Sequence, residues 1–245
     1  RQSLEVATQP TAPGLFLQVA DHRAVGTPHE AAAGVGPTSR AAGLGARIAL
    51  CVPEGGSNVE LMSPTDPTKP LSQALQKFLD RRGDGLYALM LEAPVPDEEA
   101  EALAARGLDV LPLMAGAAGR DLHPRSTHGV LIRVYPENSA PPQGDRRSRE
   151  PGLSGITRVV VGTTDADAAA KVYGHGIGLD LGPVTTDPER GVRTATCRAP
   201  AGGVVELVSA VDTSRPFARA LAAEGAGPGP GVCALVLEAA DPERA

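Results

Sequence analysis

The chain has 245 residues, of which 42% are hydrophobic but only 2% aromatic, so its core must be built mainly from Ala, Val and Leu. The formal net charge of -6 argues against a nucleic-acid partner, because such a protein needs a basic face to displace phosphate counterions. No apolar run approaches the roughly 20 residues that span a membrane, so we expect no membrane partner. The three cysteines, Cys51, Cys197 and Cys233, are too few and too scattered for a disulfide framework, so we expect a cytoplasmic location.

The first half of the chain contains several predicted elements. An opening strand is expected over Gly14 to Asp21, within a stretch that is otherwise hard to assign. A helix is predicted over Glu98 to Gly107, a strand over Leu108 to Leu113, and a last strand over Val130 to Val134.

The second half follows a polar, Pro-rich stretch, Asn138 to Gly152, that is typical of a linker. Ile156 to Val161 is predicted to be a strand, and a helix begins at Asp165, a residue type that caps helices well. Two strands joined by a glycine turn come next. A helix over Pro216 to Glu224 and a strand over Gly231 to Ala239 complete the pattern.

The two halves repeat each other. Val59 to Leu75 aligns with Val205 to Leu221 at an offset of 146 positions, with 8 of 17 residues identical. At the same offset, Gly85 to Ala93 aligns with Gly231 to Ala239. We interpret the chain as two tandem copies of one domain.

The copies differ in what they contain. The first domain is expected over residues 1–137, with 1–44 poorly assigned, a linker over 138–152, and the second domain over 153–245. The second copy lacks roughly the final quarter of its secondary structure, and the first forty residues are the candidate to complete it.

Each copy follows a strand, a helix and three further strands, the order of a βαβββ module. The stretches PLSQALQKFLDRRGDGLYALMLEA, EEAEALAARGLDVL and DLHPRSTHGVLIRVYP resemble methylmalonyl-CoA epimerase and, more broadly, the glyoxalase or vicinal-oxygen-chelate superfamily. The resemblance implies an α+β fold in which tandem βαβββ modules form two glyoxalase-like domains, the second incomplete. It also implies a divalent metal ion (Zn, Co, Ni, Mn or Fe) that chelates two substrate oxygens and stabilises an enolate.

The metal-ligand positions implied by the resemblance hold unusual residues. Glu60 and Glu206 occupy matching carboxylate positions, one in each copy, and are the candidate metal ligands. Tyr87 stands where a His is expected, Arg133 where a Glu is expected, and Arg158 where a second His is expected. Because arginine stays protonated and cannot bind a metal, the standard site cannot form.

Several roles remain open for these residues. Ion pairs of Glu60 with Arg133 and of Glu206 with Arg158 would replace the metal, since a buried charge needs a partner. Alternatively, Glu60 joins a metal site with unconventional partners or is exposed to solvent. His128 is a candidate general base near the cavity mouth that the resemblance implies.

Two classes of function follow. In the first, the chain needs no cofactor and binds a small polar or anionic metabolite in a barrel cavity lined by Tyr87, Arg133 and Arg158. In the second, it is a metal-dependent epimerase, lyase or dioxygenase acting through an enolate-type intermediate, or a metal-free isomerase. A structural partner domain is a third interpretation. A homodimer is also expected, because the incomplete second domain leaves a sheet edge to be covered.

Overall fold

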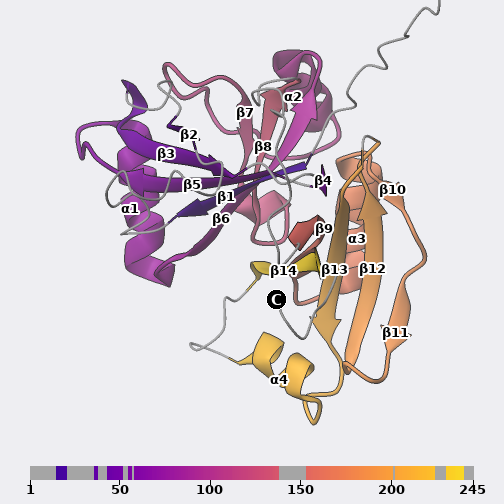
Figure 1. Ribbon diagram of the computed structural model, residues 1–245. Coiled ribbons are helices and arrows are strands. Elements are labelled where there is room, and N and C mark those ends of the chain that lie inside the picture. The colour runs from indigo at the N-terminus through magenta and orange to yellow at the C-terminus, as the bar shows by residue number, and fades with distance from the viewer. Residues whose placement is uncertain are drawn as a thin grey trace, which may run out of the picture.

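The computed structural model (Figure 1) contains two β-sheets, each flanked by helices. It describes residues 15–20, 36–37, 43–51, 55–56, 58–137, 153–200, 202–223 and 230–239. The predicted linker, 138–152, lies outside these described residues.

The first sheet is built from two modules joined side by side. Its strand order is β2 (Gly36–Pro37), β3 (Ala46–Cys51), β5 (Asn58–Pro64), β1 (Leu15–Ala20), β6 (Gly85–Ala93), β8 (Leu131–Pro136) and β7 (Arg120–Leu122). Strand β1 runs parallel to β5 and antiparallel to β6, so it sits where the two modules meet.

The position of β1 confirms one expectation and corrects another. The predicted strand over Gly14 to Asp21 is present as β1. The expectation that the first forty residues complete the second domain is wrong for β1 and β2, which both belong to the first sheet. The physical reason is that β1 has hydrogen-bonded partners on both of its edges there, which satisfies its backbone groups.

Two helices cover opposite faces of the first sheet. Helix α1 (Pro70–Arg82) has proline in its first turn, buries leucines at spacings of four, and ends at Gly83, whose φ of 72° lies in the left-handed region. Its buried side packs with Met62 of β5. Helix α2 (Pro96–Ala105) packs through Leu103 on the other face.

The second sheet repeats this arrangement in part. Its strand order is β10 (Asp180–Leu181), β12 (Val192–Arg198), β13 (Val204–Ala210), β9 (Leu153–Gly162) and β14 (Gly231–Ala239), with β11 (Thr185–Asp187) paired to β12 and β4 (Gly55–Gly56) paired to β9. Strand β9 is parallel to β13 and antiparallel to β14, as β1 is to β5 and β6. In the part of the chain that is described, no strand follows β14 where the first sheet has β8 and β7. The predicted fold class is therefore confirmed.

Helices α3 (Ala166–Lys171) and α4 (Pro216–Ala222) cover the two faces of the second sheet. The carboxylate of Asp165 caps α3 by accepting the N–H groups of the second and third residues after it, at 2.9 and 3.0 Å. A π-helical turn (Val172–Gly176) extends α3. Buried alanines let both helices lie close to the strands, which suits a chain with few aromatic residues.

The segment after α2 departs from the prediction. The expected strand over Leu108 to Leu113 reduces to one bridge, between Val110 and Leu122. Pro112 lacks a donor for a longer ladder, and the chain turns away soon afterwards. The short strand β7 was not predicted.

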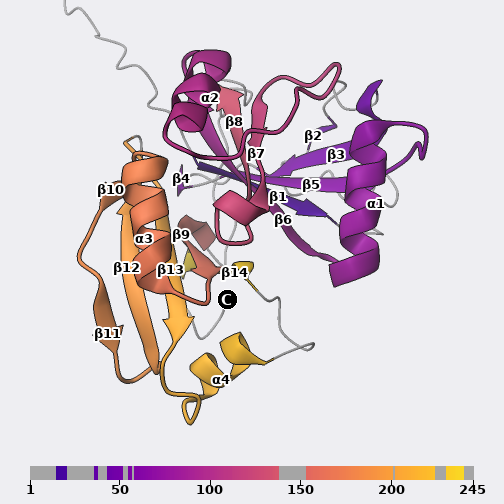
Figure 2. The same cartoon turned by 180° about the vertical axis from the view of Figure 1, so that it is seen from behind.

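The two sheets, which with their helices are called the first and second domain here, share a hydrophobic core. Leu103, Leu122 and Ile132 of the first domain belong to the same cluster of buried residues as Val159 and Leu207 of the second. Figure 2 shows α2 and α3 on adjacent parts of the two domains.

Hydrogen bonds also cross between the domains. The Tyr173 hydroxyl donates to the carbonyl oxygen of Thr127 at 3.2 Å, and Arg82 Nη2 donates to the carbonyl oxygen of Pro230 at 3.1 Å. We call this contact the domain seam. No helix among the described residues is both long enough and apolar enough to cross a membrane.

Candidate functional site

A buried ion pair joins β8 and β7, the two strands at one edge of the first sheet. Arg133 on β8 faces Asp121 on β7 in the antiparallel register. Its Nε and Nη2 donate to the two carboxylate oxygens at 2.6 and 2.8 Å. The two side chains are only 8% and 12% exposed. This two-bond geometry is the strongest form of Arg–carboxylate contact.

Glu60 and Tyr87 lie close enough to Arg133 to act on it electrostatically. Burial alone would lower the pKa of Arg133, but hydrogen bonds and charge from Asp121, with smaller effects of Tyr87 and Glu60, raise it above its usual value. Burial raises the pKa of Tyr87 to about 12, although Arg133 opposes the rise. Tyr87 is therefore a neutral phenol at physiological pH.

The structure thus brings three of the predicted residues, Glu60, Tyr87 and Arg133, into one neighbourhood. It also gives Arg133 a bidentate partner, Asp121, that the sequence did not indicate. The bidentate partner of Arg133 is thus Asp121, and the charge of Glu60 has a smaller effect on the pKa of Arg133.

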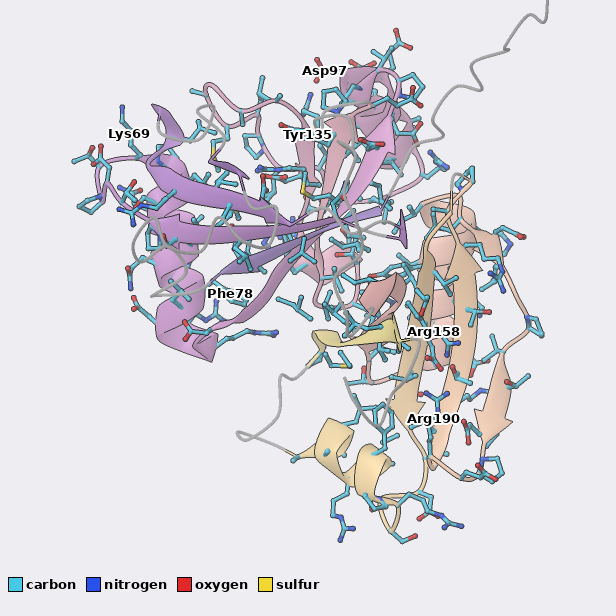
Figure 3. All side chains as sticks on the ribbon, in the orientation of Figure 1. Lys69, Phe78, Asp97, Tyr135, Arg158 and Arg190 are labelled. Carbon is cyan, nitrogen blue, oxygen red and sulfur yellow. The ribbon has the colours of Figure 1, made fainter. Side chains whose placement is uncertain are left out.

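A second buried cluster lies in the second sheet, around Glu206. Glu206 on β13 is 2% exposed and accepts from Arg158 Nη1 at 2.9 Å and from Arg190 Nη2 at 2.5 Å. The Thr194 hydroxyl donates to the same carboxylate at 3.0 Å. The predicted ion pair of Glu206 with Arg158 is confirmed. Figure 3 labels Arg158 and Arg190 on this domain.

Arg190 extends this cluster toward solvent. Its Nε donates to Asp187 at 2.7 Å, and its guanidinium lies 5.6 Å from the ring centroid of Phe217 on α4. Burial raises the pKa of Glu206, but the hydrogen bonds from Arg190, Arg158 and Thr194 outweigh burial and lower it overall. Glu206 is therefore held as a carboxylate with cationic partners on both oxygens.

These donor sets do not fit the divalent metal that the resemblance implies. No group of three or more His, Cys, Asp or Glu side chains that could hold an ion occurs within the described ranges. Asp121 and Glu206 bind guanidinium groups instead, which repel a metal cation and engage the carboxylate oxygens.

The first domain contains a cavity of about 350 Å³ at the domain seam. Its apolar wall comes from Phe78, Leu86, Val130, Leu131 and Val232. The rings of Phe78 and Tyr87 meet edge to face, with centroids 5.3 Å apart. Figure 3 shows Phe78 near the end of α1.

The polar lining of this cavity is rich in hydrogen-bond donors. Arg81 and Arg82 from the last turn of α1 lie beside Tyr87 and His123, and none of the described lining residues is acidic. Arg133 and Arg158 are not among the residues that line this cavity. Their predicted role in ligand binding stays a prediction.

His128 lies apart from these clusters, at the domain seam. Its Nδ1 is 3.1 Å from the hydroxyl of Thr163 on the second domain, and its backbone has a φ of 53°. Burial lowers its pKa, while the charge of Asp165 opposes this. Its predicted role as a general base stays a prediction.

Some of the important residues were missed by sequence reasoning. Asp121 and Arg190 could not be found because the role of Asp121 depends on strand register, and that of Arg190 on a turn between β11 and β12 that brings it to Glu206 on β13. Arg81 and Arg82 carried only a local signal, because basic residues in the last turn of a helix interact favourably with its dipole.

Comparison with known structures defines the fold. No family model matches the sequence, and no curated protein sequence matches it. The chain is similar to a triple mutant of 4-hydroxymandelate synthase from Streptomyces coelicolor, a member of the vicinal-oxygen-chelate superfamily. The identity is 15%, the TM-score is 0.61, and the match covers 93% of this chain and 71% of that chain. The chain therefore has the vicinal-oxygen-chelate fold.

Shorter proteins match part of the chain. Methylmalonyl-CoA epimerase from Mycobacterium tuberculosis is 25% identical, with 56% of this chain and 95% of that chain covered and a TM-score of 0.37. A variant of methylmalonyl-CoA epimerase from Streptomyces coelicolor is 21% identical, with 53% and 99% covered and a TM-score of 0.39.

Proposed function

We propose that the chain binds a small anionic metabolite in the cavity of its first domain, without a catalytic metal ion. The observation that carries the proposal is the buried Arg133–Asp121 pair, at a position where the resemblance implies a metal ligand. A guanidinium at this place supplies a permanent positive charge but cannot act as a Lewis acid toward two substrate oxygens.

The cavity supports the same conclusion. Its volume of about 350 Å³ lies within the range of small-molecule sites, and its wall is apolar with a few convergent polar groups. Because Arg81 and Arg82 are cationic and the described lining has no acidic group, the cavity favours an anion. This cationic lining contrasts with the net charge of -6 of the whole chain.

Elemental analysis of protein purified without chelators or an affinity tag is the first test. We expect no stoichiometric transition metal, and none after soaking with Zn²⁺ or Co²⁺. A stoichiometric metal would overturn the proposal and favour a metal-dependent enzyme, with Glu60, Glu206 and the histidines as the ligands to mutate.

A variant designed to bind a metal ion provides a second test. Tyr87→His combined with Arg133→Glu replaces the two residues that stand at metal-ligand positions and leaves Glu60 and Asp121 nearby. We expect this variant to bind Co²⁺, seen as d–d absorption, while the Arg133→Met protein does not. Co²⁺ binding to the unmodified chain would contradict the proposal.

A further inference from the structure

We infer that the ligand of the seam cavity is a small carboxylate with one apolar group, held between the two domains by Arg82, Arg81 and an apolar wall. This inference rests on the proposed function, because it names the ligand class of the same cavity.

The guanidinium of Arg82 is positioned to bind an anion. Its Nη2 donates to the carbonyl oxygen of Pro230 at 3.1 Å, which ties the guanidinium of the first domain to the second. A guanidinium presents its donors in a rigid planar fork that matches the two oxygens of a carboxylate. Arg81, the preceding residue, brings a second cation to the same cavity.

Two further donors accompany the arginines. Nδ1 of His123 accepts the backbone N–H of Arg125 at 3.1 Å, which leaves the Nε2–H group as the donor of this ring. The phenol of Tyr87 keeps its proton because burial raises its pKa to about 12. All polar side chains of the described lining can therefore donate hydrogen bonds, as an acceptor-only carboxylate requires.

The rest of the wall selects for an apolar group. The chain has only three Phe and three Tyr, yet one of each lines this cavity and forms an edge-to-face pair. Val232 of β14 adds an aliphatic surface from the second domain. A fully hydrated anion such as phosphate would leave this apolar surface uncovered, whereas a carboxylate with an alkyl or aryl group would bury it.

Isothermal titration calorimetry on the full chain tests the inference with four probes: hexanoate, hexan-1-ol, acetate and inorganic phosphate. We expect hexanoate to bind at least about tenfold more tightly than acetate, since each buried methylene adds affinity. Hexan-1-ol, which has the same apolar chain without the charge, is expected to bind at least about tenfold more weakly than hexanoate.

Variants assign the binding to this cavity. Arg82→Gln and Arg81→Gln should each weaken hexanoate binding about tenfold, a loss typical of a hydrogen bond to a charged group. Arg219→Gln is the matched control, because Arg219 is an exposed arginine in the last turn of α4. Val232→Ala should weaken hexanoate and leave acetate unchanged, with the exposed Val236→Ala on the same strand as its control.

The outcomes separate the two proposals. Acetate or phosphate binding as tightly as hexanoate, with the arginine dependence retained, would overturn the ligand class while the proposed function stands. No binding of hexanoate, acetate or phosphate would overturn both. Hexanoate binding that is unchanged in both arginine variants would place the ligand elsewhere and overturn the inference.

Discussion

The Arg133–Asp121 pair leads to a quantitative prediction about stability. Arg133→Met keeps the length of the side chain but leaves the Asp121 carboxylate, 12% exposed, without its guanidinium partner. Removing one member of a buried ion pair costs about 3–5 kcal/mol. We expect a loss of this size in the free energy of unfolding, because two hydrogen bonds of 2.6 and 2.8 Å disappear with the charge.

The double variant completes the cycle. Replacing both residues, Arg133→Met with Asp121→Leu, removes the uncompensated charge and puts apolar groups in the same space. Apolar replacement of a whole buried pair is often neutral or stabilising, so the double variant should regain at least about 2 kcal/mol over Arg133→Met. The assay is urea unfolding followed by circular dichroism, with the midpoint and slope of each variant compared.

An exposed pair provides the control. Arg106 and Glu99 are 37% and 42% exposed and joined at 2.9 Å, so Arg106→Met should cost only about 0.5 kcal/mol. The reasoning would be refuted if Arg133→Met cost no more than Arg106→Met. It would also fail if the double variant lost the full sum of the two single losses.

Three further predictions concern the seam and the second domain. Burial lowers the pKa of His128 below its usual 6.5, so the folded state favours the neutral ring, and the free energy of unfolding should fall as the pH drops below about 6.5. His128→Asn should make the free energy of unfolding less dependent on pH in this range. The same pH dependence in the variant and the unmodified chain would contradict this prediction. Gly129→Ala should destabilise the fold by more than about 1 kcal/mol, because φ is 86° and a Cβ would lie 2.3 Å from the Pro230 carbonyl oxygen. The control is Gly83→Ala, where φ is 72° but a Cβ would meet no atom within 4 Å, and thermal unfolding should show a smaller loss of stability than for Gly129→Ala. Glu206→Gln should cost about 2 kcal/mol in chemical unfolding, because charged hydrogen bonds are lost, and a cost near zero would contradict the role of this carboxylate.

The local elements followed from short-range patterns. The cap at Asp165 and the strand over Gly231 to Ala239 have the expected residue types at the expected spacing, and both are present in the structure. The predicted strand after α2 is reduced to a single bridge because Pro112 interrupts it, and the prediction from the hydrophobic pattern did not take this proline into account. Short strands such as β7 carry too few residues for a period to be seen.

For the candidate site, the sequence predicted the unusual residues but only some of their partners. The sequence and its family resemblance predicted that Arg133 and Arg158 stand where metal ligands are expected. The sequence by itself determined that these two residues are not ligands, because arginine cannot bind a metal in any fold. It also indicated the partner of Arg158, since Glu206 lies at a matching position in the repeated unit.

Only the tertiary structure decided the partner of Arg133 and the location of the cavity. Asp121 becomes its partner through the register of two antiparallel strands, and register depends on packing against the rest of the sheet. The cavity brings Arg82 of one domain beside Val232 of the other. Contacts between residues so far apart along the chain depend on how whole domains pack, and local sequence patterns carry no information about that packing.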